Sequence, residues 1–337
     1  MREIRSPIPA VFWGGMDLAK RSFQAALWGH QELGKMSTQS FDRTRKAVKI
    51  ALDWFKSMAP KGVPIGIVME ATGTFAEDVA AWLLEMDPGL RVAIVNPGQT
   101  SAFVKSLGLR NKTDDLDSRA LARYGFERSP IVWERPTPEM AALKDLVRIR
   151  TDLVRARASM SCRLKDHERC PEACHALEAT VRNLEGEVEA LDRAIEDHIA
   201  AHQELAPSVK RLMSIKGVGI VTATTVLVEL GDLRRFTRSR QLTAFAGLSP
   251  KQRLSGTSVK GKAHLCKQGS PRVRAVLYMA AGSAIRFNPD LKAFYEGLLA
   301  KGKTERSAQG AVMRKLLVLM RAVLKRGNDW EPMRKTA

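Results

Sequence analysis

The sequence predicts an α/β domain at the N-terminus, followed by a part that is built mainly from helices. Three observations support this division. From about residue 11 to 135, short apolar runs typical of strands alternate with amphipathic helical stretches. From 138 to 206 the apolar residues recur at the four-three spacing of coiled coils. From 207 to about 330 the chain is helical, basic and punctuated by glycines. We therefore expect three domains, at residues 8–137, 138–206 and 207–330.

The N-terminal domain is expected to open with three strands and a helix. Residues 11–17 form the first strand, 22–28 its hairpin partner and 35–41 a short third strand. A helix over 43–58 follows, because its apolar residues fall on one side at helical spacing. These residues are Ala47, Ala51, Trp54, Phe55 and Met58, flanked by Val48 and Leu52.

The rest of this domain alternates buried strands and helices. The near-continuous apolar runs at 65–69 and 91–95 predict buried parallel strands. Asn96-Pro97-Gly98 ends the second of these strands. Helices are expected over 75–86 and 116–126. Three strands, helix, strand, helix, strand and helix is the order of a layered α/β domain.

The middle domain is expected to be two helices separated at Pro171. In the second helix a seam of apolar residues runs for three heptads, and in the first helix three apolar residues stand seven apart. An antiparallel hairpin within one chain and a coiled coil between chains both fit this pattern. We favour a contribution to oligomerisation, into a dimer or tetramer. The seam consists of Leu177, Val181, Leu184, Val188, Leu191, Ile195 and Ile199 (or His198), and the earlier set is Leu146, Leu153 and Met160.

The charge of the chain points to a polyanionic partner. Lys and Arg number 55 against 36 Asp and Glu, for a net charge of +19. Such an excess favours nucleic acids, because each neutralised phosphate releases counterions. No apolar stretch is long enough to span a membrane, and the N-terminus lacks the apolar region of a signal peptide. We therefore expect no membrane partner. The four cysteines form no CxxC pair, so we expect reduced thiols and a cytoplasmic location.

Four carboxylates are placed to share one site. Asp17 and Glu70 each stand at the end of an expected strand, and strand ends can converge on one crevice. Asp114 and Asp117 are three apart at a helix start, so they share a face. Four such carboxylates can bind two Mg²⁺ ions for phosphoryl transfer. Asp115 points off that face and is expected to be a bystander.

A structural interpretation of these acids stays open. Asp114 can be a helix N-cap and Asp117 a favourable charge in the first turn. Glu70 is harder to explain in this way, because it follows a buried apolar run and an unpaired buried carboxylate is costly. Asp17, at the end of a glycine-rich strand, has the same character.

Three short blocks carry a resemblance to a known family. The segments 16–20 (MDLAK), 69–73 (MEATG) and 112–117 (KTDDLD) resemble the DEDD transposases, which are bacterial insertion-sequence recombinases related to Piv-type DNA invertases. The resemblance continues through Asn96-Pro97, residues 109–111 and the C-terminal domain, and so covers almost the whole chain. It implies an RNase-H-like or RuvC-like first domain whose four acids, Asp17, Glu70, Asp114 and Asp117, hold Mg²⁺.

The C-terminal domain contains a helix-hairpin-helix pattern over residues 212–223. Lys216, Gly217 and Gly219 lie in its turn, where backbone N–H groups at a helix N-terminus can hold a DNA phosphate. A plain corner between two helices, packed for stability alone, is the other interpretation.

The blocks 245–250, 254–256 and 267–274 are similar to the family's C-terminal domain, in which a serine of a Ser-Gly element is the nucleophile. By that match the nucleophile is Ser255, and its attack on a phosphodiester would link the protein to DNA. Ser249 and Ser258 are rivals, and an isolated Ser-Gly is usually only a turn. Cys266 stands where relatives often carry serine, which leaves the contacts of Lys267 open.

Basic residues surround the serine, and we expect them to bind phosphates or to stabilise developing charge. A solvated basic loop is the alternative. The residues concerned are Lys251, Arg253, Lys260, Lys262, Lys267 and, further along, Arg272.

The resemblance implies a DNA transposase or recombinase with a composite site, in which the acids and Ser255 come from different subunits. Several relatives use a structured guide RNA, and the resemblance implies one here. Two rival functions are a RuvC-like nuclease that uses water and a catalytically silent nucleic-acid-binding protein. An actin-like kinase is disfavoured, because the sequence lacks a clear second phosphate-binding glycine loop.

Overall fold

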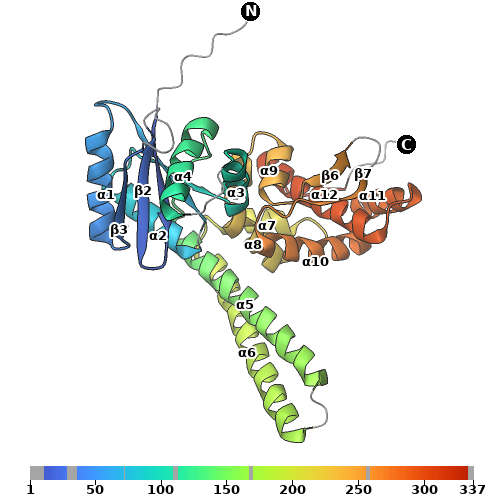
Figure 1. Cartoon of the computed structure of the whole chain (residues 1–337). Coiled ribbons are helices and arrows are strands. Elements are labelled where there is room, and N and C mark those ends of the chain that lie inside the picture. Colours follow the sequence, from blue (N-terminus) through green and yellow to red (C-terminus); the bar gives the residue numbers. More distant parts are fainter. Residues whose placement is uncertain are drawn as a thin grey trace, which may run out of the picture. The chain divides into compact units, whose positions relative to one another are not determined.

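The computed structural model describes residues 11–28, 36–71, 73–108, 113–166, 170–255 and 259–332, and the side chains of 74, 165 and 252–263 lie outside this description. The chain divides into two compact units, Met1–Arg135 and Pro136–Ala337. Their boundary lies next to the first of the two expected domain boundaries. Figure 1 shows a mixed α/β first unit and a mainly helical second unit, which confirms the predicted fold class at this level.

The first unit contains a five-stranded sheet in the order β3-β2-β1-β4-β5. The strands β1 (Phe12–Leu18), β2 (Ser22–Trp28) and β3 (Thr38–Asp42) form an antiparallel meander. The strands β4 (Ile65–Glu70) and β5 (Arg91–Val95) continue the sheet in parallel with β1. The five predicted strands are therefore confirmed, with β3 shifted slightly along the chain.

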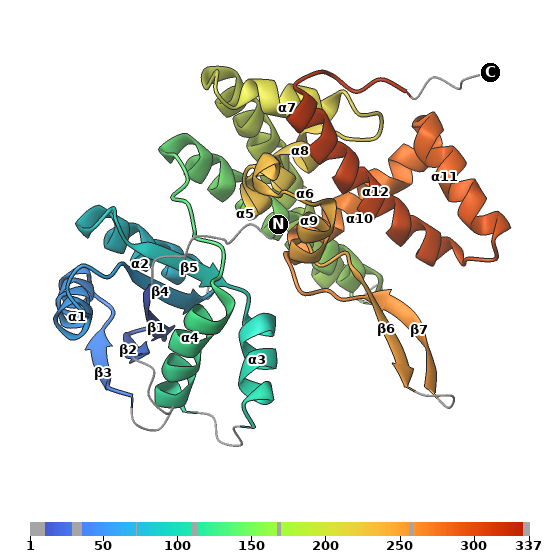
Figure 2. The same ribbon diagram turned by 90° about the horizontal axis from the view of Figure 1, so that it is seen from above.

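Helices cover both faces of this sheet, as Figures 1 and 2 show. The helices α1 (Arg45–Met58) and α2 (Thr74–Met86) pack on one face, where Phe55 and Leu83 share a core with Met16 and Met69. Helix α4 (Asp114–Arg128) packs on the other face, through a smaller core. That core contains Trp13, Val68, Ala93, Val95 and Leu121.

One helix of this unit was not predicted. Helix α3 (Pro97–Ser106) begins at the residues that the sequence analysis interpreted only as the end of a strand. Asn96 is its N-cap and accepts a hydrogen bond from the backbone of Gly98 at 2.8 Å, while Pro97 takes the first helical position. Asn followed by Pro is a recognised helix start, so the signal was present in the sequence.

The second unit begins with a helical hairpin formed by α5 (Pro138–Asp166) and α6 (Pro171–Ala201). Figure 1 shows the two helices side by side, and the Arg150–Asp192 and Arg157–Glu185 ion pairs join them. The hairpin within one chain is therefore present. A contribution to oligomerisation stays a prediction. In the apolar seam Val188, Ile195 and Ile199 are buried, whereas Leu177, Val181, Leu184 and Leu191 are only half-buried.

The remaining helices form a body around one hydrophobic core. The inner ends of α5 and α6 contribute Leu143 and Ile195 to that core, so the middle helices and the C-terminal helices pack as a single unit. No described helix is both long and apolar enough to cross a membrane. The elements are α7 (Ala206–Met213), α8 (Ile220–Leu230), the 3-10 turn η2 (Leu233–Arg235), α9 (Ser239–Phe245), α10 (Pro271–Phe287), α11 (Pro289–Ala300) and α12 (Glu305–Arg326).

A two-stranded hairpin interrupts these helices, in a stretch that was expected to be helical. The strands β6 (Pro250–Ser255) and β7 (Val259–Leu265) pair in antiparallel fashion. Their sequences, PKQRLS and VKGKAHL, are mostly polar and lack the repeated apolar residues that reveal a strand resting on a core.

We predict that Gly15→Ala destabilises the first unit by about 1–3 kcal/mol, the range for an overpacked core. A Cβ on Gly15 would lie 2.1 Å from the backbone oxygen of Ser118 and 2.5 Å from the nitrogen of Ala122, and helix backbone cannot move aside cheaply. Chemical unfolding followed by tryptophan fluorescence measures this change, since five of the six tryptophans belong to the first unit.

Gly186→Ala is the control for this measurement. Gly186 lies inside helix α6, and a Cβ there meets nothing within 4 Å. We expect it to be neutral or slightly stabilising, because alanine is the better helix former. Equal effects of the two substitutions would contradict the packing argument.

Candidate active site

Asp17 and Glu70 stand at the ends of two adjacent parallel strands. Met16 on β1 lies opposite Met69 on β4, so the next residue on each strand is one of the two acids. Side chains alternate along a strand, which puts Asp17 on the same face as Gly15 and Glu70 on the same face as Val68. Both Gly15 and Val68 contact helix α4, so the two half-buried acids share the α4 face of the sheet.

The direction of α4 brings its own acids to the same end of the sheet. Gly125 packs against Trp13, and Ser118 packs against Gly15 further along β1, so the helix runs antiparallel to the strand. The first turn of α4, with Asp114 and Asp117, therefore continues past Gly15 toward the end where Asp17 stands. Strand register and helix direction together bring all four predicted acids to one face and one end of the sheet.

The carboxylates suit a divalent metal ion by their chemistry, because hard cations such as Mg²⁺ prefer carboxylate oxygens. Among the described residues, however, no three Asp, Glu, His or Cys side chains stand close enough together to hold one ion. The four acids therefore lie at the same end of the same face of the sheet, but their carboxylates do not surround a single point.

The structure also addresses the alternative role of Asp114. The N-cap of α4 is Thr113, whose hydroxyl accepts a hydrogen bond from the backbone of Leu116 at 3.3 Å. Asp114 is therefore not the N-cap, and it is exposed in the first turn. Asp115 forms an ion pair with Arg119 at 2.9 Å, and its role as a bystander stays a prediction.

Thr100 holds Glu70 from helix α3 and was missed by the sequence analysis. Its side chain is buried, and its hydroxyl donates a hydrogen bond to one carboxylate oxygen of Glu70. The carbonyl of Pro97 lies 3.0 Å from the same hydroxyl. A hydroxyl has one proton, and a charged acceptor makes the stronger bond. Thr100 thus orients Glu70 and leaves its second oxygen available.

Arg43 connects the turn after β1 with the helix that follows β4. Its guanidinium donates to the backbone oxygen of Lys20, in the turn after β1, at 2.6 and 3.0 Å. It also lies over the ring of Phe75, in the first turn of α2, at 3.8 Å from the ring centroid. Arg43 therefore ties the turn after β1 to the start of α2, the helix that follows β4. No local pattern in the sequence indicated this contact.

The β6–β7 hairpin separates the candidate serines. Ser255 is the last residue of β6 and pairs with Val259, so it stands at the hairpin turn. Ser249 lies half-buried at the hairpin base, where its carbonyl accepts a hydrogen bond from Cys266 at 2.9 Å. Ser258 lies outside the described residues. The side chains of Ser255, Arg253, Lys260 and Lys262 are likewise outside the description.

The base of the hairpin is fixed by two crossing backbone segments. A Cβ on Gly269 would lie 2.4 Å from the carbonyl oxygen of Phe245 and 2.6 Å from the nitrogen of Gly247. The guanidinium of Arg274 donates to the carbonyl of Gly269 at 2.7 Å, and its burial lowers the pKa of this guanidinium from the usual value. Lys267 adopts a φ of 58° beside this crossing, and its backbone donates to Gly247 at 3.2 Å.

The cysteine at position 266 does not disturb this base. Cys266 contributes the backbone hydrogen bond to Ser249, which any residue other than proline would make. The side chain of Lys267 is exposed, as is that of Lys251 at the start of the hairpin.

The helix-hairpin-helix residues divide into packed and exposed ones. Gly217 has a φ of 99°, and a Cβ on it would lie 2.6 Å from the backbone of Ala284 on α10. This glycine is therefore required by packing. Gly219 is exposed as the N-cap of α8, which receives no side-chain cap, and Lys216 is exposed beside it. The N–H groups of this helix start are placed to meet an anion.

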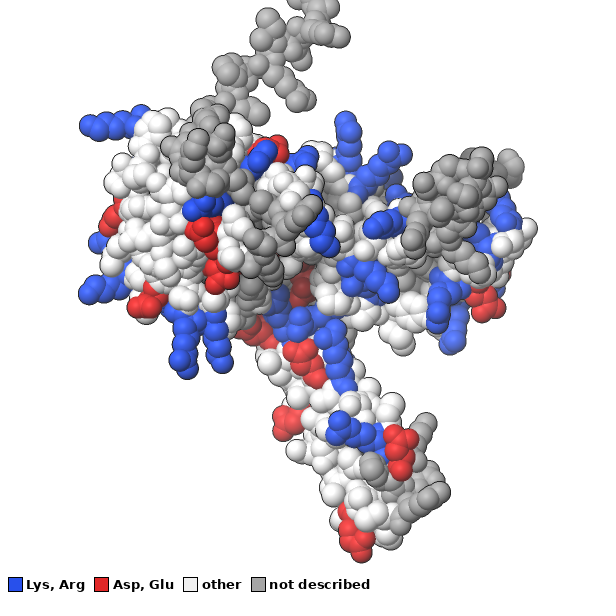
Figure 3. Space-filling model, viewed as in Figure 1, with Lys and Arg blue, Asp and Glu red and all other residues white. Residues whose placement is uncertain are grey.

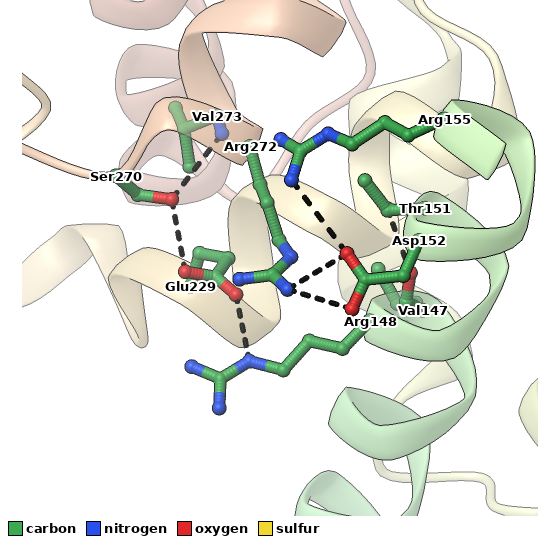
Figure 4. A network of polar contacts seen from close by, with 9 residues as sticks. All are labelled: Val147, Arg148, Thr151, Asp152, Arg155, Glu229, Ser270, Arg272 and Val273. Carbon is green, nitrogen blue, oxygen red and sulfur yellow. Dashed lines mark hydrogen bonds and ion pairs between the residues drawn. The ribbon is translucent and has the colours of Figure 1, made fainter. Parts of the chain in front are cut away.

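Arg272 is engaged inside the second unit. Figure 4 shows its guanidinium donating to both carboxylate oxygens of Asp152, at 3.0 Å each. In the same network Glu229 accepts from Arg148 and from Ser270 at 2.9 Å. These contacts join α10 and α8 to α5, so Arg272 anchors the helical hairpin to the body.

Two family models match this chain. One, for transposases of the DEDD type of IS110 and described as "Transposase", matches residues 14–167. The other, described as "Transposase IS116/IS110/IS902 family", matches residues 209–296. The first match contains all four acids, and the second contains the β6–β7 hairpin.

Curated relatives extend the similarity over most of the chain. It is 28% identical to the pilin gene-inverting proteins of Moraxella bovis and Moraxella lacunata over 326 residues, which cover 94% of this chain and 97% of each relative. It is 28% identical to the transposase for insertion sequence element IS1111A of Coxiella burnetii over 301 residues, 81% of this chain and 77% of that protein.

We predict that Thr100→Val lowers the free energy of unfolding of the first unit by about 1–3 kcal/mol, the range for losing a hydrogen bond to a charged group. Valine keeps the shape of threonine and removes only the donor to Glu70. Chemical unfolding without metal measures the effect. Thr100→Ser, which keeps the hydroxyl, is the control and should lose less. Wild-type stability in Thr100→Val would show that the bond to Glu70 contributes nothing.

Proposed function

Because the chain belongs to the DEDD transposases of the IS110 and IS116 type, and is thus a DNA transposase or recombinase, we propose that it cuts and exchanges DNA strands with Mg²⁺ and a serine nucleophile. Asp17, Glu70, Asp114 and Asp117 are the proposed ligands of the metal, and Ser255 is the proposed nucleophile. The observation that carries the proposal is the arrival of all four acids at one face and one end of the sheet.

The first unit is proposed to be RuvC-like. This assignment rests on its element order, in which an antiparallel meander of three strands is followed by two parallel strands joined through helices. The acids then come from two central strands and from the helix that covers them, which are rigid elements. Sites on such elements hold their geometry better than sites on loops.

The roles of the residues follow from their positions. When bound, Mg²⁺ polarises the scissile phosphate and stabilises the charge that develops there. Asp17 and Glu70 would hold it from the sheet, and Asp114 and Asp117 from the helix. Thr100 keeps one oxygen of Glu70 in place. Asp114 is exposed in the first turn of α4, so its side chain is free to turn toward the metal when the ion binds.

Ser255 performs the exchange in this proposal. Its Oγ forms a bond to phosphorus while the bond from phosphorus to the 3′ oxygen breaks. The serine proton passes to solvent, and the released 3′ oxygen takes up a proton. The phosphoserine link conserves the bond for later joining to another 3′-hydroxyl. Ser255 and the acids belong to different compact units, and the family resemblance supports a composite site that combines units from different subunits.

The basic residues are proposed to hold the DNA. Lys251, Lys267 and Lys216 are exposed. Arg253, Lys260 and Lys262 lie on the strands of the β6–β7 hairpin. Gly217, in the turn before α8, and Gly219, the N-cap of α8, are proposed to offer backbone N–H groups. Arg272 can bind a phosphate only if Asp152 releases it, so we expect a smaller contribution from this residue.

The proposal also includes the oligomeric state of the protein, its overall reaction and a guide RNA. The half-buried outer part of the α5–α6 seam supports a dimer or tetramer formed through these helices. The name of the Moraxella relatives, pilin gene-inverting protein, supports recombination between two DNA sites as the overall reaction. A structured guide RNA is proposed from the family resemblance, and the high positive charge is compatible with it.

We predict that Asp17→Ala, Glu70→Ala, Asp114→Ala and Asp117→Ala each reduce Mg²⁺-dependent strand cleavage at least about 100-fold while leaving the fold intact, because each removes a metal ligand. Asp115→Ala is the matched control, since Asp115 is already paired with Arg119 and should lose little. Cleavage of a labelled DNA substrate on denaturing gels measures the rates. Normal cleavage by Asp114→Ala would refute the assignment of the helix acids.

We predict that the protein becomes attached to a DNA end through Ser255, in a link that survives denaturation. Ser255→Ala should lose the adduct and recombination but still bind DNA, because only one hydroxyl is removed. Denaturing electrophoresis with labelled DNA and Mg²⁺ shows the adduct as a shifted band. Ser249→Ala and Ser258→Ala are the controls. Cleavage without an adduct in all of these proteins would instead support a nuclease that uses water.

A further inference from the structure

Helix α9 and the turn before it carry a basic and aromatic surface that the proposed reaction does not use. The α9 surface consists of Arg238, Arg240 and Phe245. We propose that it binds an unpaired nucleic-acid strand, with a base stacked on Phe245 and the neighbouring phosphates on the two arginines. The inference needs only that nucleic acid is the substrate, and it does not depend on the metal or on Ser255.

Charge is the first argument for this ligand. Between Leu233 and Pro289 the chain contains 12 Lys and Arg residues and no Asp or Glu. Figure 3 shows many blue and few red side chains over the second unit where α9 and α10 lie. Asp232, the acid nearest before this stretch, is already paired with Arg234 at 2.9 Å. A surface of this sign attracts phosphates.

The geometry of α9 puts the three residues on its solvent side. Leu242, Thr243 and Ala246 are buried, and they occupy one side of the helix. Arg238, Arg240, Gln241, Ala244 and Phe245 are exposed on the other side. At helical spacing, the small Ala244 and Gln241 lie between Arg240 and Phe245.

Phe245 is unusual because its large apolar ring is exposed to solvent and is also contacted by neighbouring side chains. It is 42% exposed. Its ring centroid lies 5.5 Å from that of the buried Phe236, and the guanidinium of Arg235 stands 5.5 Å from the Phe245 centroid. Arg235 is itself fixed, since it donates to the carbonyl of Leu230 at 3.0 Å. A preorganised ring of this kind is what base stacking requires.

The turn before α9 is also anchored. Arg321 on α12 is buried and donates to the carbonyls of Phe236, at 2.6 and 2.9 Å, and of Thr237, at 2.9 Å. At the end of α9, the carbonyl of Phe245 lies close to Gly269, at the base of the β6–β7 hairpin. A nucleic-acid strand that stacks on Phe245 would therefore lie next to the base of the β6–β7 hairpin, which carries Ser255. Strand exchange produces unpaired segments, and this surface would hold one beside the hairpin.

The test compares Phe245→Leu with wild type in the full chain without Mg²⁺, so that neither catalysis nor the metal site affects the result. The probes are a fluorescent single-stranded DNA, the single-stranded RNA of the same sequence and the corresponding DNA duplex. Leucine remains apolar and removes only the aromatic ring. We expect the affinity for a single strand to fall about 5- to 100-fold, the effect of losing one stacked base, and the affinity for the duplex to change little.

Phe287→Leu is the matched control. Phe287 is the last residue of α10, is 65% exposed and belongs to no ring pair or cation–π contact among the described residues. It should leave binding to all three probes unchanged. The larger loss, on DNA or on RNA, identifies which strand the surface holds. Unchanged single-strand affinity in Phe245→Leu, or an equal loss on the duplex, would overturn the proposal and leave the recombinase assignment untouched.

The arginines give a second measurement that does not depend on the ring. Arg238→Gln and Arg240→Gln should each reduce the slope of log affinity against log salt by about 0.7, the value for one phosphate of a single strand. Both side chains are exposed, so the substitutions do not affect the core. Slopes equal to that of wild type would show that the arginines do not touch the strand and would also overturn the proposal.

Discussion

The close packing of α4 against β1 is the constraint on which the candidate active site depends. The helix backbone occupies the space above Gly15 that any side chain would fill, and Gly125 allows the same approach at Trp13. These two contacts determine both the distance and the direction of the helix. With that direction, the acids of its first turn arrive at the end of the sheet where the adjacent strands β1 and β4 leave Asp17 and Glu70. A longer distance or the opposite direction would separate the two pairs of acids.

Much of the first unit was predictable, because its strands and helices show the local spacing of apolar residues that is typical of each. The runs 65–69 and 91–95 are apolar enough to predict buried strands, and Glu70 stands out directly after the first of them. Thr100 and Arg43 were not predictable. Thr100 contacts Glu70 across 30 residues of sequence, and Arg43 contacts Lys20 across 23, so only the folded chain brings each pair together. Asn96-Pro97 did contain the signal for α3, and the interpretation as a strand end alone overlooked it.

The second unit shows where patterns of apolar residues are uninformative. The β6–β7 hairpin carries Ser255 on mostly polar strands, and its base depends on the approach of Gly247 and Gly269, which are more than 20 residues apart. Basic residues likewise look alike in sequence. The structure distinguishes Arg272 and Arg321, which hold helices and turns together, from Arg238 and Arg240, which face solvent. For a protein of this charge, that distinction decides which arginines are available to a nucleic acid.

The central claim is that acids from two strands and one helix act as a single metal site, and a double-mutant cycle in Mn²⁺ binding tests it most directly. Calorimetry or electron paramagnetic resonance would measure the affinity of wild type, Asp17→Asn, Asp114→Asn and the double variant. If the acids share one site, each single variant weakens binding about 10- to 100-fold and the double variant loses much less than the product of the two effects. Independent, multiplicative losses, or unchanged affinity in Asp114→Asn, would contradict the convergence of α4 and the sheet on one metal site.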